Sequence, residues 1–281
     1  NQSPAKIVDI DLQNALLHIH DFTVGSLELG NNSEFENVDI FTKNTFHTIA
    51  RADALAGIGR YLETRPFYTT DSFVSHRNQG PEWRTVHLGL DVFMDAESVI
   101  YTPCDGTVYS LQNNDETGDY GPTVMLEHKI NNQLTFWTLY GHLTQDSIEN
   151  LTIGQEVKKG EALCKMGNYP VNGNWPPHLH FQVILDIFDH KGNYPGVAYF
   201  SEKEIWASIC PNPNLLLQIP VKTNIKYQEK PQQNILQSRQ KHLAKNLSIS
   251  YQKPLHIVRG YGQYLYDIKG RRYLDTVNNV A

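Results

Sequence analysis

Two histidines that alternate with apolar residues constrain this chain more than any other feature. Residues 177–183 read Pro-His-Leu-His-Phe-Gln-Val. In a β-strand, residues two apart point to the same face, so His178, His180 and Gln182 share one face and the apolar residues among them share the other. Such a strand can pack on a core and present two imidazoles as half of a metal site. A second His-x-His at residues 18–20 raises the question of which pair has partners.

A second polar cluster lies far upstream, in a segment that we predict to be one strand over Thr85–Phe93. In such a strand His87, Gly89 and Asp91 share one face, and apolar residues occupy the other. Glycine leaves open space between the two polar groups. A third piece is Tyr-Gly-His-Leu, which places His142 at the end of an aromatic strand.

These side chains have the donor atoms of a catalytic zinc site. Such a site has three protein ligands and one position open to water. His87, Asp91 and His180 would supply two neutral imidazoles and one carboxylate, and the bound water would then reach a pKa of roughly 7. His142 and His178 would remain to take a proton from the water and to stabilise an oxyanion or protonate the leaving amine.

Each piece also has an ordinary structural explanation. Paired histidines on strands often face solvent, and we interpret His18 and His20 in that way. A lone His142 is compatible with a hydrogen-bonded structural role. The combination of the three motifs in one β-rich region favours a metal site. We expect the remaining histidines to be structural or exposed: His47, His76, His128 and His190.

Composition excludes several classes of function. The chain has 281 residues, a formal net charge of −6 and a pI near 6.0, which disfavours nucleic acid or an anionic membrane as the main partner. It has no apolar run near the roughly 18 residues of a membrane span, and no secretory signal is visible. Its three widely spaced cysteines fit a reducing compartment, so we expect a cytoplasmic location.

The pattern changes along the chain. Helical spacing over 43–62 predicts a helix that Gly57 and Gly59 end, and Ile7–Ile10 resembles a short strand. From Trp83, short alternating runs broken by turn residues predict antiparallel β-structure. We divide the chain into a partly helical extension or linker, a metal-binding domain, a Pro- and Asn-rich linker, and a C-terminal segment: 1–66, 67–210, 211–234 and 235–281.

Smaller elements are predicted within these parts. Residues 123–128 and 134–140 form a hairpin around an Asn-Asn turn. Lys159-Gly160 is the turn between strands at 154–157 and 162–166. Near the C-terminus, we predict a polar helix over 235–247 and then two short strands joined by a turn at 267–270.

The three motifs together resemble the lysostaphin-type zinc endopeptidases, whose fold is the duplicated hybrid motif. The resemblance covers about residues 83–188 and includes Pro-x-x-Gly-x-Val at 103–108. It implies a mainly β fold with an antiparallel, sandwich-like core. It also implies zinc bound by His87, Asp91 and His180, with His142 and His178 as catalytic residues, and cleavage of peptides of bacterial peptidoglycan. The approach to the last motif differs from the family pattern, because Trp175 and two prolines replace Gly-rich sequence.

A second resemblance lies at 254–279, which looks like the opening of a class-III pyridoxal-phosphate aminotransferase of the phospho-lyase subgroup. The cofactor lysine is absent from this piece, so pyridoxal phosphate would bind only in a further C-terminal domain. The resemblance implies an excerpt of a multidomain fusion, with a phosphotransferase-like domain before and an aminotransferase after, able to form homo-oligomers through the latter.

Three functions follow. The leading hypothesis is a zinc-dependent hydrolase that cleaves a peptide or amide bond with a zinc-bound water, on a substrate that could derive from peptidoglycan. The first alternative is a non-catalytic or substrate-channelling module in a larger fusion enzyme. The second is a fragment whose biological activity is transamination or phospho-lyase chemistry elsewhere in the protein.

Overall fold

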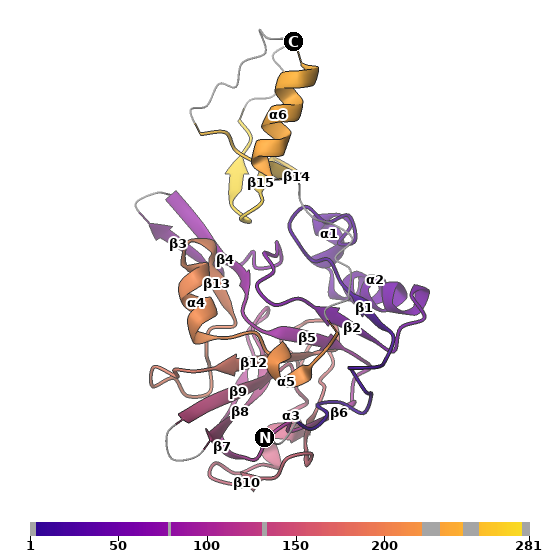
Figure 1. Ribbon diagram of the computed structural model, residues 1–281, viewed down its shortest axis with the longest axis vertical. Helices are drawn as coiled ribbons and strands as arrows, with labels where there is room; N and C mark the ends of the chain where they lie inside the picture. Colours follow the sequence, from indigo (N-terminus) through magenta and orange to yellow (C-terminus); the bar gives the residue numbers. More distant parts are fainter. Residues whose placement is uncertain (1–3, 78–79, 131–133, 221–230, 244–252, 277–281) are drawn as a thin grey trace.

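The computed structural model describes residues 4–77, 80–130, 134–220, 231–243 and 253–276. It is mainly β, with 21% helix and several antiparallel sheets, which confirms the predicted fold class (Figure 1). The Asn-Asn turn at 131–132, much of the linker at 211–234 and the end of the predicted helix at 235–247 lie outside the described residues. Within the described part of the chain, no helix is both long enough and apolar enough to cross a bilayer.

An eight-stranded sheet forms the centre of the molecule. Its order is β1-β2-β5-β12-β9-β8-β7-β10, with β1 and β2 parallel and the other neighbours antiparallel. The strands are β1 (Leu17–Ile19), β2 (Ala56–Gly59), β5 (Leu90–Phe93), β7 (Gly106–Asn114), β8 (Gly121–Ile130), β9 (Leu134–Gly141), β10 (Glu156–Val157) and β12 (Leu179–Ile184).

The described residues also form three smaller sheets. They have the orders β13-β4-β3, β11-β6 and β14-β15-β16. Their strands are β3 (Val74–Arg77), β4 (Gly80–His87), β6 (Val99–Tyr101), β11 (Ala162–Lys165), β13 (Val197–Tyr199), β14 (Ile257–Tyr261), β15 (Tyr264–Asp267) and β16 (Arg272–Leu274).

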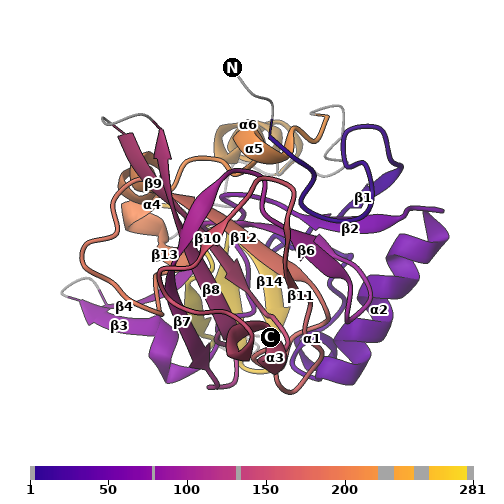
Figure 2. The same cartoon turned by 90° about the horizontal axis from the view of Figure 1, so that it is seen from below.

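The helices are short and lie around the sheets. They are α1 (Asn32–Phe35), α2 (Val38–Arg51), α3 (Gln145–Glu149), α4 (Lys203–Ile209), α5 (Asn214–Leu217) and α6 (Gln232–His242), with 3₁₀ turns η1 (Asp71–Phe73) and η2 (Phe200–Glu202). Seen from below, α2 and α4 lie on opposite sides of the central strands (Figure 2).

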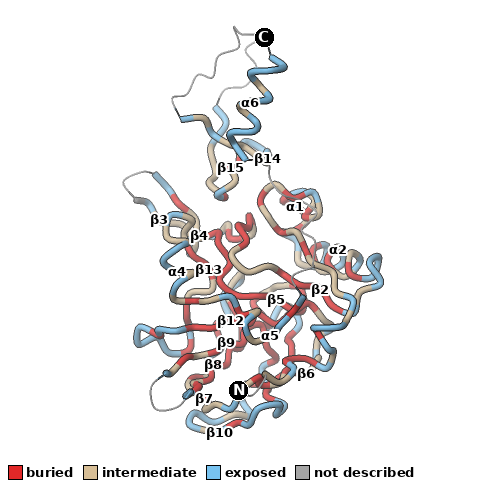
Figure 3. The backbone as a smooth tube through the Cα atoms, viewed as in Figure 1, coloured by how far each residue is buried: buried red, intermediate tan, exposed pale blue. Residues whose placement is uncertain are grey.

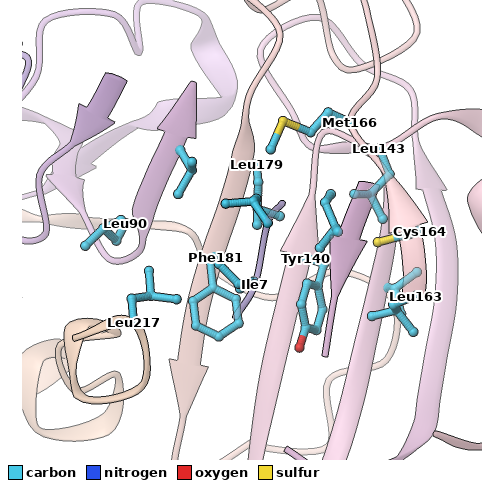
Figure 4. Packing of buried hydrophobic residues seen from close by; sticks show 14 of the residues in the cluster. Ile7, Leu90, Tyr140, Leu143, Leu163, Cys164, Met166, Leu179, Phe181 and Leu217 are labelled. Atoms are coloured by element: carbon cyan, nitrogen blue, oxygen red, sulfur yellow. The ribbon is translucent and has the colours of Figure 1, made fainter. Parts of the chain in front are cut away.

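The core explains why β12 can hold polar side chains rigidly. Every residue of β12 is buried, and buried residues follow the central strands (Figure 3). On the apolar face, Leu179 and Phe181 are fully buried, and the Phe181 ring lies 5.3 Å from that of Tyr140 (Figure 4). Burial of such a side chain stabilises the fold by about 2 kcal/mol. The apolar half of the strand therefore anchors the histidine half.

The prediction that Gly57 and Gly59 end a helix was wrong. Helix α2 ends at Arg51, and the two glycines lie in strand β2 of the central sheet. Their place in a strand follows from crowding. A Cβ on Gly57 would lie 2.3 Å from His20 Nε2, and one on Gly59 would lie 2.6 Å from Asp91 Oδ2. Glycine is needed there because side chains of neighbouring segments fill the space.

The prediction of one continuous strand over Thr85–Phe93 was also wrong. β4 ends at His87 and β5 begins at Leu90. The two strands belong to different sheets, because His87 pairs with Val197 whereas Asp91 pairs with His180. The chain thus changes sheets between the two polar groups.

Other predictions had mixed outcomes. The hairpin partners β8 and β9 pair as predicted, and so do β15 and β16 around the turn at 267–270. At Ile7–Ile10 there is only an isolated bridge between Val8 and Ile100. The strands that flank Lys159-Gly160 do not pair with each other, because β10 joins β7 and β11 joins β6.

The C-terminal sheet packs against the first part of the chain. Arg259 in β14 donates hydrogen bonds to the backbone carbonyls of Val24, Ser26 and Gly30, at 2.6–2.8 Å. On β4, the Thr85 hydroxyl donates to the carbonyl of Lys269. The segment that resembles an aminotransferase is therefore joined to the rest of the described chain by specific polar contacts.

Candidate metal centre

Two of the candidate ligands, Asp91 and His180, lie in one row of paired residues across the central sheet. Gly59 of β2 pairs with Asp91 of β5, Asp91 pairs with His180 of β12, and His180 pairs with Gly141 of β9. The carboxylate and the imidazole are thus direct cross-strand neighbours, with a glycine at either end of the row. His87 reaches them from the end of β4.

The three predicted ligands lie close together. The distance from Asp91 Oδ1 is 3.1 Å to His87 Nε2 and 3.3 Å to His180 Nδ1, and the two nitrogens are 2.9 Å apart. All three residues are at most 3% exposed. Among the described residues they form one of two groups with the spacing of a metal site, and it is the fully buried one.

In each imidazole, the nitrogen that points away from the candidate metal position has a hydrogen-bond acceptor, and this places the proton on that nitrogen. His87 Nδ1 lies 3.0 Å from the carbonyl oxygen of Arg60, which can only accept, so this nitrogen is the donor. His180 Nε2 lies 3.0 Å from Gln182 Oε1. The Gln182 amide nitrogen donates to the Pro195 carbonyl at 3.1 Å, which orients the amide oxygen toward the imidazole.

It follows that three unprotonated atoms face one another. His87 Nε2 and His180 Nδ1 carry lone pairs in the neutral tautomers just described, and buried Asp91 Oδ1 has no hydrogen-bond donor. Lone pairs 2.9–3.3 Å apart repel unless a cation lies among them. Two imidazoles and a carboxylate are zinc ligands, and imidazoles oriented by outer hydrogen bonds are typical of zinc sites. The residues present therefore fit a zinc ion.

The electrostatics keep these groups in ligating form. Burial lowers the pKa of His87 to about 4, so the ring is neutral at pH 7. Burial alone would raise the pKa of Asp91, but the charge of Arg65, 2.7 Å from Oδ2, opposes burial, and the pKa lies well below the usual value. The carboxyl is therefore ionised.

His142 and His178 lie beside this group. Their ring centroids are 4.2 Å apart, and both rings are buried. His142 Nδ1 lies 2.8 Å from the Asn172 carbonyl and His178 Nδ1 lies 2.7 Å from the Pro176 carbonyl, so both Nε2 atoms are free of protons when the rings are neutral. His178 Nε2 lies 3.9 Å from Asp91 Oδ1.

Burial lowers the pKa of both rings, to about 4 for His178 and well below the usual value for His142. His142 also has a positive φ of 65°, a conformation that non-glycine residues rarely adopt. Its backbone is held there by a 2.7 Å hydrogen bond to the Tyr120 carbonyl. The structure thus brings together all five side chains that the sequence singled out.

The imidazole of His180 occupies the space that a side chain at Gly89 would need. A Cβ there would lie 2.4 Å from His180 Cε1 and 2.6 Å from Nε2. The sequence indicated open space at this glycine, and the structure fills it with the imidazole of His180. Gly89 therefore admits a candidate ligand.

The interpretation of His18 and His20 as solvent-facing was wrong for His20, which is only 1% exposed. Both rings lie against Glu28, with His18 Nε2 at 3.1 Å and His20 Nδ1 at 2.7 Å from the same carboxylate oxygen. Burial opposes ionisation of Glu28, but the hydrogen bonds from the two histidines lower its pKa to about 2. No acceptor among the described residues fixes a proton on His20 Nε2. Donation by both rings to Glu28 accounts for this cluster without a metal.

The five residues line one cleft. Aromatic side chains form much of its wall, including Trp175, whose ring lies 6.0 Å from Phe67 and 6.2 Å from Tyr68. The sequence had marked Trp175 as a departure from the family pattern. It gave no signal for Arg65, a buried cation at the base of the cleft that contacts Asp91.

Comparison with known proteins agrees with this geometry. Residues 85–192 match the profile of a family described as Peptidase family M23. The chain therefore contains an M23 (lysostaphin-type) peptidase domain, which confirms the resemblance inferred from the three motifs. The match begins just before His87 and includes all five candidate residues.

Solved structures similar to this chain include two peptidases. A zinc-containing peptidase from Vibrio cholerae is 26% identical, with a TM-score of 0.27 over 35% of this chain and 27% of that chain. The catalytic domain of lysostaphin from Staphylococcus simulans is 21% identical, with a TM-score of 0.31 over 43% of this chain and 80% of that chain.

The second resemblance also has counterparts. Over 44 residues, which are 15% of this chain, the sequence is 50% identical to a Drosophila melanogaster protein named alanine–glyoxylate aminotransferase 2-like. It is 47% identical over 47 residues to a mitochondrial homologue from Arabidopsis thaliana, 17% of this chain. The chain spans only 9% and 10% of the length of these two relatives.

Proposed function

We propose that the M23 domain is a zinc-dependent hydrolase that cleaves a peptide or other amide bond. The observation that carries this proposal is the convergence of three unprotonated buried atoms, on His87, Asp91 and His180, beside two further neutral imidazoles. A degenerate binding module would have no need for His142 and His178 in addition to the three ligands.

A zinc ion bound there supplies Lewis acidity and lowers the pKa of a water molecule to about 7. His178 and His142 keep an unprotonated Nε2, because each Nδ1 donates to a backbone carbonyl. Either Nε2 can accept a proton as the attacking water loses it. The imidazolium can then donate that proton to the leaving amine or hydrogen-bond to the developing oxyanion.

The substrate class that we propose is a peptide, with peptidoglycan-derived peptides as the first to test. A screen of muropeptides and small amides against zinc-loaded wild type and His178→Ala tests this. We expect the variant to keep zinc and to lose hydrolysis by a factor of about 10² to 10⁴. His190→Ala is the matched control, since His190 is exposed and lies outside the cleft.

The competing candidate is a non-catalytic or channelling module in a fusion with an aminotransferase. The short aminotransferase-like match and the contacts of Arg259 with residues 24–30 support this candidate. Stoichiometric zinc without cleavage of any substrate in the screen would favour it over hydrolysis.

A further inference from the structure

We propose that Arg65 is a positioning residue for the candidate metal ligand Asp91, supplied by the segment that precedes the M23 match. This inference rests on the proposed zinc centre but does not require hydrolysis. It gives a function to a buried charge that neither the motifs nor the family match identifies.

The guanidinium of Arg65 bridges two buried carboxylates. Nη1 donates to Asp91 Oδ2 at 2.7 Å, and Nε donates to Glu63 Oε2 at 2.9 Å. Arg65, Glu63 and Asp91 are 4%, 5% and 1% exposed. Because solvent does not screen these contacts, their geometry is well defined.

The contact with Asp91 decides which oxygen faces the metal. Arg65 occupies Oδ2, while Oδ1 faces the unprotonated nitrogens of His87 and His180. A carboxylate without this partner can rotate about its Cβ–Cγ bond and offer either oxygen, or both. Arg65 would therefore favour zinc binding through one oxygen of Asp91, which would leave a coordination position for water.

The surroundings fix the guanidinium in turn. Gly59 has no Cβ, and one built there would lie 2.7 Å from Arg65 Nη2. The rings of Phe22 and Phe67 lie 5.4 and 6.0 Å from the guanidinium carbon. Glu63 is itself held by the backbone amide of Phe22 at 2.9 Å. The orientation of Asp91 thus depends on several residues before position 67.

Because Glu63 pairs with Arg65, the proposed effect of Arg65 on Asp91 is mainly one of orientation and not of added positive charge. Glu63 is ion-paired with both Arg60 and Arg65, so it offsets part of the positive charge beside the candidate metal site. A buried pair of this kind is weak evidence for stability, since burying the two charges is itself costly. Its position against a candidate ligand gives it the geometry of an outer hydrogen bond to a metal site.

The test is the zinc affinity of Arg65→Lys, measured by competition with a chromophoric chelator, together with the visible absorption of the Co²⁺-loaded protein. Lysine keeps the charge but cannot reach both carboxylates with a planar fork. We expect zinc affinity to fall about tenfold to a hundredfold and the Co²⁺ bands to change in position or intensity. Arg51→Lys is the control, because Arg51 makes the same substitution at the exposed end of α2, away from the residues that line the cleft.

An Arg65→Lys protein with the circular dichroism of wild type, unchanged zinc affinity and unchanged Co²⁺ bands would overturn the proposal. If this variant does not fold, Glu63→Gln replaces it, because it keeps Arg65 and removes only the negative charge of one of its two partners. We expect Glu63→Gln to weaken zinc binding several-fold, and unchanged affinity would again overturn the role. Wild type that binds zinc but cleaves nothing would contradict the proposed hydrolysis and leave this inference standing.

Discussion

Replacing Gly89 with alanine should distort the candidate metal centre while leaving the fold intact. The new Cβ would lie 2.4 Å from His180 Cε1, 2.6 Å from Nε2 and 2.9 Å from the carbonyl oxygen of Phe181. Non-bonded carbons rest at roughly 3.5 Å, so the imidazole must recede by about 1 Å. The backbone of Gly89 is not in the positive-φ region, so alanine meets no conformational barrier of its own.

The size of the effect follows from what His180 contacts. A shift of about 1 Å breaks the 3.0 Å hydrogen bond to Gln182 or moves Nδ1 away from Asp91. We expect zinc affinity to fall about tenfold to a hundredfold, as for loss of an outer hydrogen bond to a ligand. Overpacking should lower the free energy of unfolding of the metal-free protein by about 1–3 kcal/mol.

The assay combines urea unfolding in chelator with unfolding in excess zinc. Each tenfold weakening of binding removes about 1.4 kcal/mol of zinc-dependent stabilisation, so Gly89→Ala should lose more stability with zinc than without it. Gly260→Ala is the control, because its Cβ would lie 3.6 Å from the nearest atom of Leu265. Equal losses with and without zinc, or wild-type zinc affinity, would refute the reasoning.

Three further outcomes can be measured on the same protein. Burial lowers the pKa of His178 to about 4, whereas the pKa of this residue in the unfolded chain is near 6.5, so the unfolded chain binds more protons than the folded protein between these values. As the pH falls from 6.5 to 4, the free energy of unfolding of metal-free wild type should therefore decrease by up to about 3 kcal/mol through this residue. Urea unfolding of His178→Gln should show a smaller pH dependence. Metal analysis should give one zinc per chain in wild type and in His18→Ala and none in His180→Ala, and a second ion that disappears in His18→Ala would contradict the hydrogen-bonded interpretation of that cluster. Arg259→Met should weaken docking of the C-terminal sheet by about 2 kcal/mol, seen as faster amide exchange in β14 at unchanged zinc affinity.

Alternation within a strand is a local property, so the sequence alone could indicate on which side of a strand the candidate site residues lie. His180 lies in β12 among apolar residues that must be buried, and His178 directly precedes that strand, so the pattern alone indicated the direction of both side chains. Asp91 was also placed on the correct side, although the strand that carries it begins only at Leu90. Local alternation survived the break because each short piece still packs its apolar residues.

What the sequence could not show depends on contacts between distant segments. The glycines of β2 look like helix terminators when only their neighbours in sequence are considered. They are strand residues because His20 and Asp91 occupy the space a side chain would need. The burial of His20 and its contact with Glu28 likewise depend on how the first segment folds onto the sheet.

The candidate metal centre therefore depends on residues outside the segment that carries its motifs. The family match begins at residue 85, yet the carbonyl that fixes the His87 proton belongs to Arg60, and the cation that orients Asp91 is Arg65. Of the three candidate ligands, His180 alone takes its outer partner, Gln182, from within the match. Because outer hydrogen bonds set both tautomer and orientation, the chemistry of the two upstream ligands depends on the residues before the match.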